Sequence, residues 1–70
     1  MKMKKAILRG FNSDNYLATI EISGSNRVYL ENITVARNLP SDEMAIGSKL
    51  AVVFFDEHNA KEAVVIAVYR

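Results

Sequence analysis

Apolar and polar residues alternate in two inner stretches of the chain. In residues 16–22 every second residue from Ala18 onward is apolar, and residues 27–31 repeat the pattern. A period of two is typical of a strand that turns one face to the core and the other to water. Both stretches are therefore predicted strands. Asn32 interrupts the second, but apolar residues resume behind it, which indicates a bend within one strand.

Clusters of Asn, Ser, Asp and Gly or Pro recur at short intervals and predict turns at residues 12–15, 23–26, 38–42 and 56–59. The segments between them predict strands at residues 6–11, 16–22, 27–36, 49–55 and 63–69. Several short strands with this spacing favour a sandwich or a barrel. We predict an all-β fold in which residues 1–70 form one domain, a five-stranded antiparallel barrel that is closed or nearly closed. An OB-like and an SH3-like barrel both fit the pattern.

One short helical turn is predicted between the third and fourth strands, over residues 40–47, with a plain loop as the alternative. Ser41 is a residue type that caps helix N-termini, and Gly47 is one that ends helices. Met44 and Ile46 supply apolar side chains in between. We expect both to plug one end of the barrel.

The last two predicted strands are apolar on both faces, unlike a strand with one face in water. If alternation holds throughout, the bulkier sets face the core, namely Leu50, Val52 and Phe54 in one strand and Val64, Ile66 and Val68 in the other. The outward residues are then Ala51, Val53 and Phe55 with Ala63, Val65, Ala67 and Tyr69.

Two interpretations of this outward face remain open. Large apolar patches usually mark contact sites, which makes the face a subunit interface with Val53, Phe55, Val65 and Tyr69 as its candidate residues. In the other interpretation, small alanines simply line a partly exposed surface. A chain of 70 residues has a marginal core, and self-association is one way to stabilise it.

Composition excludes several kinds of chemistry. The chain has no cysteine and one histidine, so it holds neither disulfides nor thiolate zinc sites. The cluster 56–59 combines acids, an amide and the histidine, but consecutive residues rarely converge on one point, and a solvated hairpin loop explains them. The serines lie in turns, and the three glycines form no phosphate loop. We expect no enzyme activity, no cofactor and no metal.

Nucleic acid is the alternative partner. Small Greek-key barrels bind oligonucleotides on their second and third strands, using aromatic and basic side chains. The candidate residues for such a face are Arg9, Tyr16, Arg27 and Tyr29. Glu21 and Glu31 lie on the same strands and would repel phosphates, and a net charge of +1 adds no bulk attraction.

The N-terminal segment has a basic start but too few apolar residues before Arg9 for a signal peptide. The chain also has no apolar stretch long enough to span a bilayer. We therefore expect no membrane partner and a cytoplasmic location, or a virion-associated one if the protein is of phage origin.

Two hairpins carry a resemblance to a known family. Residues 47–55, a polar loop and residues 63–69 resemble the closing hairpin of OB-type barrels in phage tail and baseplate hub proteins. Gly10 and Phe11, followed by a polar turn and residues 16–22, resemble the opening of the same barrel. Residues 35–40 and 54–59 are similar to segments of short uncharacterised proteins from phage-like gene clusters.

This resemblance implies a structural barrel in a phage or prophage tail-like assembly, with no catalytic residue to transfer. The first hypothesis for function is therefore a non-enzymatic assembly module whose partner is itself or another assembly protein. The second is an OB-type protein that binds single-stranded nucleic acid.

Overall fold

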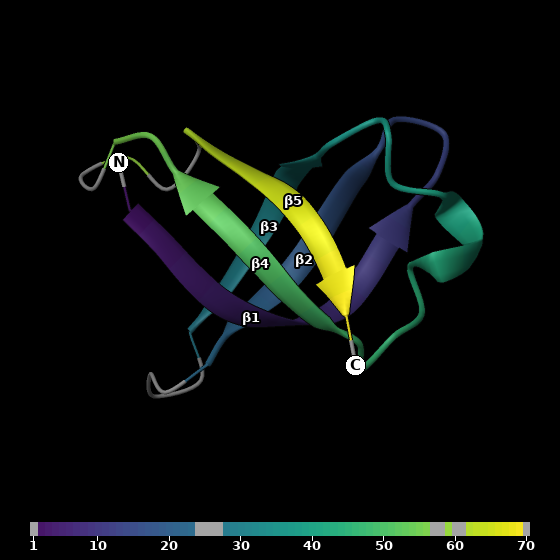
Figure 1. Ribbon diagram of the computed structural model, residues 1–70, viewed down its shortest axis with the longest axis horizontal. Coiled ribbons are helices and arrows are strands. Elements are labelled where there is room, and N and C mark those ends of the chain that lie inside the picture. The colour runs from purple at the N-terminus through teal and green to yellow at the C-terminus, as the bar shows by residue number, and fades with distance from the viewer. Residues whose placement is uncertain (1, 24–27, 57–58, 60–61, 70) are drawn as a thin grey trace.

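Five strands and one short 3-10 turn make up the computed structural model, which describes residues 2–23, 28–56, 59 and 62–69 (Figure 1). In chain order these elements are β1 (Lys2–Asn12), β2 (Leu17–Ile22), β3 (Tyr29–Val35), η1 (Ser41–Glu43), β4 (Lys49–Phe54) and β5 (Ala63–Tyr69). The all-β prediction is confirmed, including the helical turn between the third and fourth strands. No helix in the described residues has the length and hydrophobicity needed to cross a membrane.

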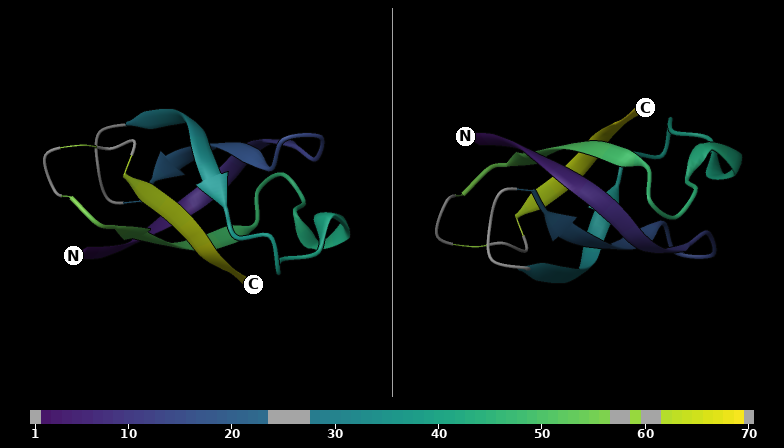
Figure 2. Two further views of the ribbon diagram at one scale, coloured as in Figure 1. Left: turned by 90° about the horizontal axis from the view of Figure 1, so that it is seen from above. Right: turned by 90° about the horizontal axis from the view of Figure 1, so that it is seen from below.

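The strands close into a barrel in the order β1-β2-β3-β5-β4, with β4 hydrogen-bonded back to β1 (Figures 1 and 2). The meander β1-β2-β3 and the return of β4 beside β1 form a Greek key. Neighbouring strands run antiparallel except β3 and β5, which pair in parallel at Thr34–Val64 and Val35–Val65. A closed ring with an odd number of strands cannot alternate direction throughout, so it must contain a parallel pair.

The core fills the inside of this barrel. Its largest fully buried side chains come from every strand, and they are Leu8, Ile20, Ile33, Val35, Leu50, Val52 and Val65. No buried polar or charged residue occurs in the described part of the chain. The domain is therefore stabilised mainly by removal of aliphatic surface from water, at about 25 cal/mol per Å².

β1 begins four residues earlier than predicted. Lys2 to Lys5 pair with β4, from Phe54 to Ala51, beyond the point where pairing with β2 begins at Ala6. Alternation did not reveal this part of the strand because it is mostly lysine. Lysine is a common residue on exposed sheet edges, where it discourages pairing with other chains.

Three bulges interrupt the ladders of the barrel. Register shifts occur at Arg9 in β1, at Glu31 and Asn32 in β3, and at Ile66 in β5. Asn32 has a positive φ of 57°, which explains the bend predicted there. An extra residue on one strand reverses the phase of alternation beyond it.

The bulge at Ile66 makes part of the predicted inward and outward sets in β5 wrong. Before the bulge, Ala63 and Val65 face the core, and Val65 is completely buried, although both were expected to face outward. Val64 is only half-buried and Ile66 is exposed, although both were expected to face inward. After the bulge, Val68 packs against the core and Tyr69 is exposed, as predicted.

The helical turn is shorter than predicted and is capped differently. It spans only Ser41–Glu43, begins after Pro40, and has no side-chain hydrogen bond at its start, so the predicted Ser41 cap is wrong. Met44 is buried in the core cluster and plugs the barrel as expected, whereas Ile46 is 62% exposed and does not. Gly47 lies beyond the turn at a φ of 92°, and its N–H donates to the carbonyl of Leu8.

Candidate assembly surface

The outer sides of β1, β4 and β5 form a mainly apolar surface that also carries Lys5 and Lys49, which we call the hairpin face. The strand register sets its side chains in rows across the three strands, because side chains on one face alternate along each strand. One row joins Met3, Val53 and Val64, the next joins Lys5, Ala51 and Ala67, and the third joins Ile7, Lys49 and Tyr69. Phe55 directly follows β4, and its N–H donates to the carbonyl of Glu62 at 2.8 Å, which extends the face by one more pair.

Large apolar side chains on this face are exposed to solvent. Phe55 is 54% exposed and Ile66 is 39% exposed, and Met3 and Tyr69 are exposed as well. β4 and β5 lie at the front in Figure 1, with the C-terminal end of β4 at the upper left and the C-terminal end of β5 at the lower right. Several large apolar side chains exposed on one side of a protein usually mark a contact site.

The four predicted interface residues differ in how exposed they are. Phe55 and Tyr69 lie exposed on the hairpin face. Val53 lies on the same face by register, is 8% exposed, and does not belong to the core cluster. Val65 is in the core, so its inclusion was wrong.

Two large side chains of the hairpin face were missed by sequence reasoning. Ile66 was placed in the core because an all-apolar strand gives no sign of a bulge. Met3 precedes the predicted first strand, and only its pairing with Val53 brings it onto the face.

An open groove of about 400 Å³ lies at the Tyr69 end of the face. Its lining residues come from the loop before β4 and from the adjoining ends of β4 and β5, and they are Ala45, Ile46, Gly47, Ser48, Lys49 and Tyr69. Ile46 and Tyr69 both leave apolar surface exposed there. The hairpin face thus has a projecting aromatic side chain, Phe55, at one end and a partly apolar groove at the other.

Of the residues predicted for a nucleic-acid face, Arg9 and Tyr29 both lie next to Glu21. Arg9 is held by Glu21, with its Nε donating to Oε1 at 2.7 Å and its Nη2 lying 2.6 Å from the same oxygen. Tyr29 is 53% exposed and pairs with Glu21 across the β2–β3 ladder. Arg27 lies outside the described residues.

Tyr16 is part of the packing rather than of a free surface. Its hydroxyl donates to the carbonyl of Leu39 at 2.8 Å, and its ring meets Phe11 edge-on with the centroids 5.2 Å apart. The Arg37 guanidinium lies over the same ring, 5.8 Å from its centroid. A ring held in this way ties the loop after β1 to the loop after β3 and leaves little surface for a stacked base.

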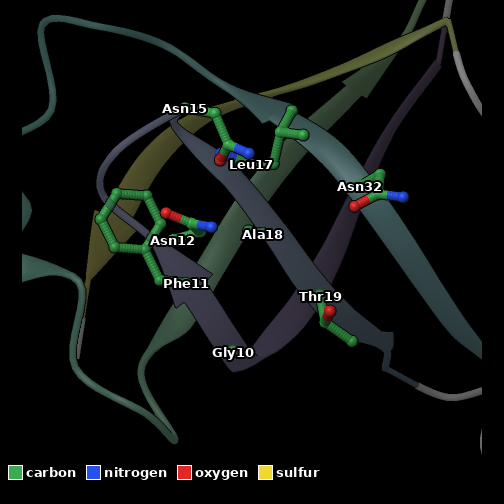
Figure 3. A pocket seen from close by; sticks show the side chains of 8 residues that line it. All are labelled: Gly10, Phe11, Asn12, Asn15, Leu17, Ala18, Thr19 and Asn32. Atoms are coloured by element: carbon green, nitrogen blue, oxygen red, sulfur yellow. The ribbon is translucent and has the colours of Figure 1, made fainter.

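A small hollow of about 240 Å³ lies over β1, β2 and β3 (Figure 3). Its lining combines amide, hydroxyl and apolar side chains, and consists of Gly10, Phe11, Asn12, Asn15, Leu17, Ala18, Thr19 and Asn32. A Cβ at residue 10 would lie 3.7 Å from the Thr19 Cβ, which is an ordinary van der Waals contact. The Oδ1 of Asn12 accepts the N–H of Asp14, and the Oδ1 of Asn15 accepts the N–H of Leu17 at the start of β2.

The described residues include no group of three or more His, Cys, Asp or Glu side chains placed to hold a metal ion. Of the cluster 56–59, Glu57 and His58 lie outside the described residues. The backbone N–H of Asn59 donates to the carbonyl of Asp56 at 3.1 Å.

No protein-family model, curated protein or solved structure matches this chain.

Proposed function

We propose that this protein is a non-enzymatic assembly module that associates with further copies of itself through the hairpin face. The observation that carries the proposal is that the outward positions of β4 and β5 are mostly apolar instead of polar. As a result Phe55, Ile66 and Tyr69 are exposed to solvent outside the core cluster. A barrel that needed only its own core would have polar residues at these outward positions. Full burial of a large apolar side chain contributes about 1.5–3 kcal/mol, and a side chain that is already partly buried in the single chain contributes proportionally less to association.

A tail-like particle of phage or prophage origin is the setting we propose for this assembly. The support is the resemblance of residues 47–55 and 63–69 to the closing hairpin of phage hub barrels. The finer assignment to the OB type belongs to the same proposal. It is supported by the Greek-key strand order and by the position of η1 between β3 and β4.

Sedimentation velocity of the wild-type protein tests this function. We expect the weight-average sedimentation coefficient to rise with protein concentration towards the value of a closed oligomer, because closed symmetry is the usual outcome of self-association. A protein that sediments as a monomer up to millimolar concentration would rule the proposal out.

Binding of single-stranded nucleic acid is the second candidate. It is favoured by the hollow over β1, β2 and β3, because small Greek-key barrels bind oligonucleotides on this side. It is opposed by the pairing of Arg9 with Glu21 and by the packing of Tyr16.

Fluorescence anisotropy with labelled single-stranded oligonucleotides at low and high salt separates the two functions. An assembly module is expected to show no specific binding at either salt concentration. Tight binding that weakens steeply with salt, and weakens further in Tyr29→Ala, would instead support the nucleic-acid function. Phe55→Ala is the matched control, since Phe55 and Tyr29 are 54% and 53% exposed on different sides of the barrel.

A further inference from the structure

The two ends of the hairpin face complement each other. At one end the exposed residues Phe55 and Glu62 are joined by a backbone hydrogen bond, and at the other the exposed residue Lys49 lines the groove together with Ile46 and Tyr69. Lys49 and Phe55 are six residues apart along β4 and its extension, which corresponds to a separation of about 20 Å. The two ends of the hairpin face therefore cannot contact each other within one molecule. A second copy can contact both, because it presents the same two ends.

We infer that two copies pack face to face with their β4 strands antiparallel, so that Phe55 of each copy enters the Ile46–Tyr69 groove of the other. This arrangement rests on the proposed function and specifies its partner and geometry. A two-fold axis that lies between the two faces, perpendicular to the strands and level with Val52, generates this arrangement. The axis places the row of Phe55 and Glu62 opposite the partner's row of Lys49 and Tyr69.

The middle of the face is complementary under the same axis. On β4 and β5, Val53 and Val64 are placed opposite the partner's Ala51 and Ala67, so larger side chains meet smaller ones, and on β1 Met3 is placed opposite the partner's Lys5. Such pairing of large with small residues is what lets two layers interdigitate without voids. The bulged residue Ile66 lies between these rows and therefore meets its own counterpart at the axis.

A two-fold axis along the strands would give the opposite result. It would place the row of Phe55 and Glu62 opposite the partner's same row, and the row of small alanines opposite another row of alanines. Glu62 would then lie closer to the partner's Glu62, and Lys49 closer to the partner's Lys49, than in the antiparallel arrangement, and like charges close together across an interface oppose association. Size and charge therefore both favour the antiparallel arrangement.

Cysteine cross-linking tests the arrangement, and the natural chain contains no cysteine to interfere. Glu62→Cys and Lys49→Cys are prepared separately and treated with a short bismaleimide, alone and as an equimolar mixture. We expect the cross-linked dimer to form mainly in the mixture and to contain one chain of each kind by intact mass. Cross-linking of each variant with itself, at the expense of the mixed product, would overturn the antiparallel arrangement.

The variant with both cysteines tests closure. A two-fold dimer is expected to stop at the mass of two chains joined by two linkers, since the two sites on one chain are too far apart to be joined to each other. A ladder of higher oligomers would indicate an open head-to-tail chain and overturn the two-fold axis.

Charge exchange provides a measurement that leaves Phe55 and its groove intact. Glu62→Lys and Lys49→Glu are each expected to weaken dimerisation about tenfold, because each change affects two symmetric pairs. The double variant is expected to recover most of the wild-type affinity. If it does not recover while the wild type dimerises, the arrangement is wrong but the assembly function stands; a monomeric wild type would remove both.

Discussion

Replacement of Phe55 by aspartate is expected to convert the associated protein into a folded monomer. Phe55 is half exposed in the single chain, so the variant loses little packing within its own barrel. In the two-fold dimer two such side chains are lost, and two carboxylates are introduced into an apolar groove. Together these effects are expected to weaken association by about 4 kcal/mol, or roughly a thousandfold.

Sedimentation velocity and far-UV circular dichroism on the same samples check this result. Val28→Asp is the matched control, because Val28 is 43% exposed next to β3, outside the hairpin face, and receives the same charge. We expect the control to associate like the wild type. An unfolded Phe55→Asp variant would assign Phe55 to the core, and a variant that associates normally would move the interface away from the hairpin face.

The strand segments could be predicted from the sequence because the turns are punctuated by Asn, Asp, Ser, Gly and Pro. The strand at residues 63–69 has the predicted bounds. The parallel pairing of β3 with β5 was not predicted, although it follows from closing a ring with an odd number of strands. Each hairpin signal in the sequence concerns only two neighbouring strands and is satisfied when these two run antiparallel. Such local patterns do not reveal that five strands in a closed ring must include one parallel pair.

The site residues were less predictable than the strands, because their roles depend on contacts between distant parts of the chain. Arg9 lies at a bulge and binds a carboxylate on the next strand. Tyr16 has a positive φ of 55° and packs under the loop that follows β3. A basic and an aromatic residue near a predicted strand are consistent with a ligand face, and nothing in the sequence shows that another part of the chain already contacts them.

The prediction of which β5 side chains face the core failed for a different reason. Each residue from Ala63 to Tyr69 is apolar, so the strand has no polar position that marks its outer side. Choosing the bulkier set as the inner one is correct in β4, where the ladder is regular from Val52 to Phe54. In β5 the extra residue at Ile66 reverses the phase, and side-chain size cannot reveal a bulge.

Two neighbouring substitutions with opposite outcomes follow from this bulge. Val65→Asp places a carboxylate in a core where the described residues supply no buried polar side chain to pair it, at a cost of several kcal/mol. A domain of this size has a total stability of roughly 4–10 kcal/mol, so the variant is expected to be largely or fully unfolded. Ile66→Asp places the same group on the outer surface and is expected to lower the free energy of unfolding by only about 1 kcal/mol.

Both substitutions are best measured in the Phe55→Asp background, where dimerisation does not add to the stability of the fold. Urea denaturation followed by circular dichroism then gives the free energy of unfolding of the single barrel. If alternation continued unbroken through β5, Ile66 would lie in the core and Val65 outside it, and the order of the two variants would be reversed. A stable Val65→Asp barrel beside an unfolded Ile66→Asp barrel would therefore contradict the bulge, and with it the row of outward side chains that forms the hairpin face.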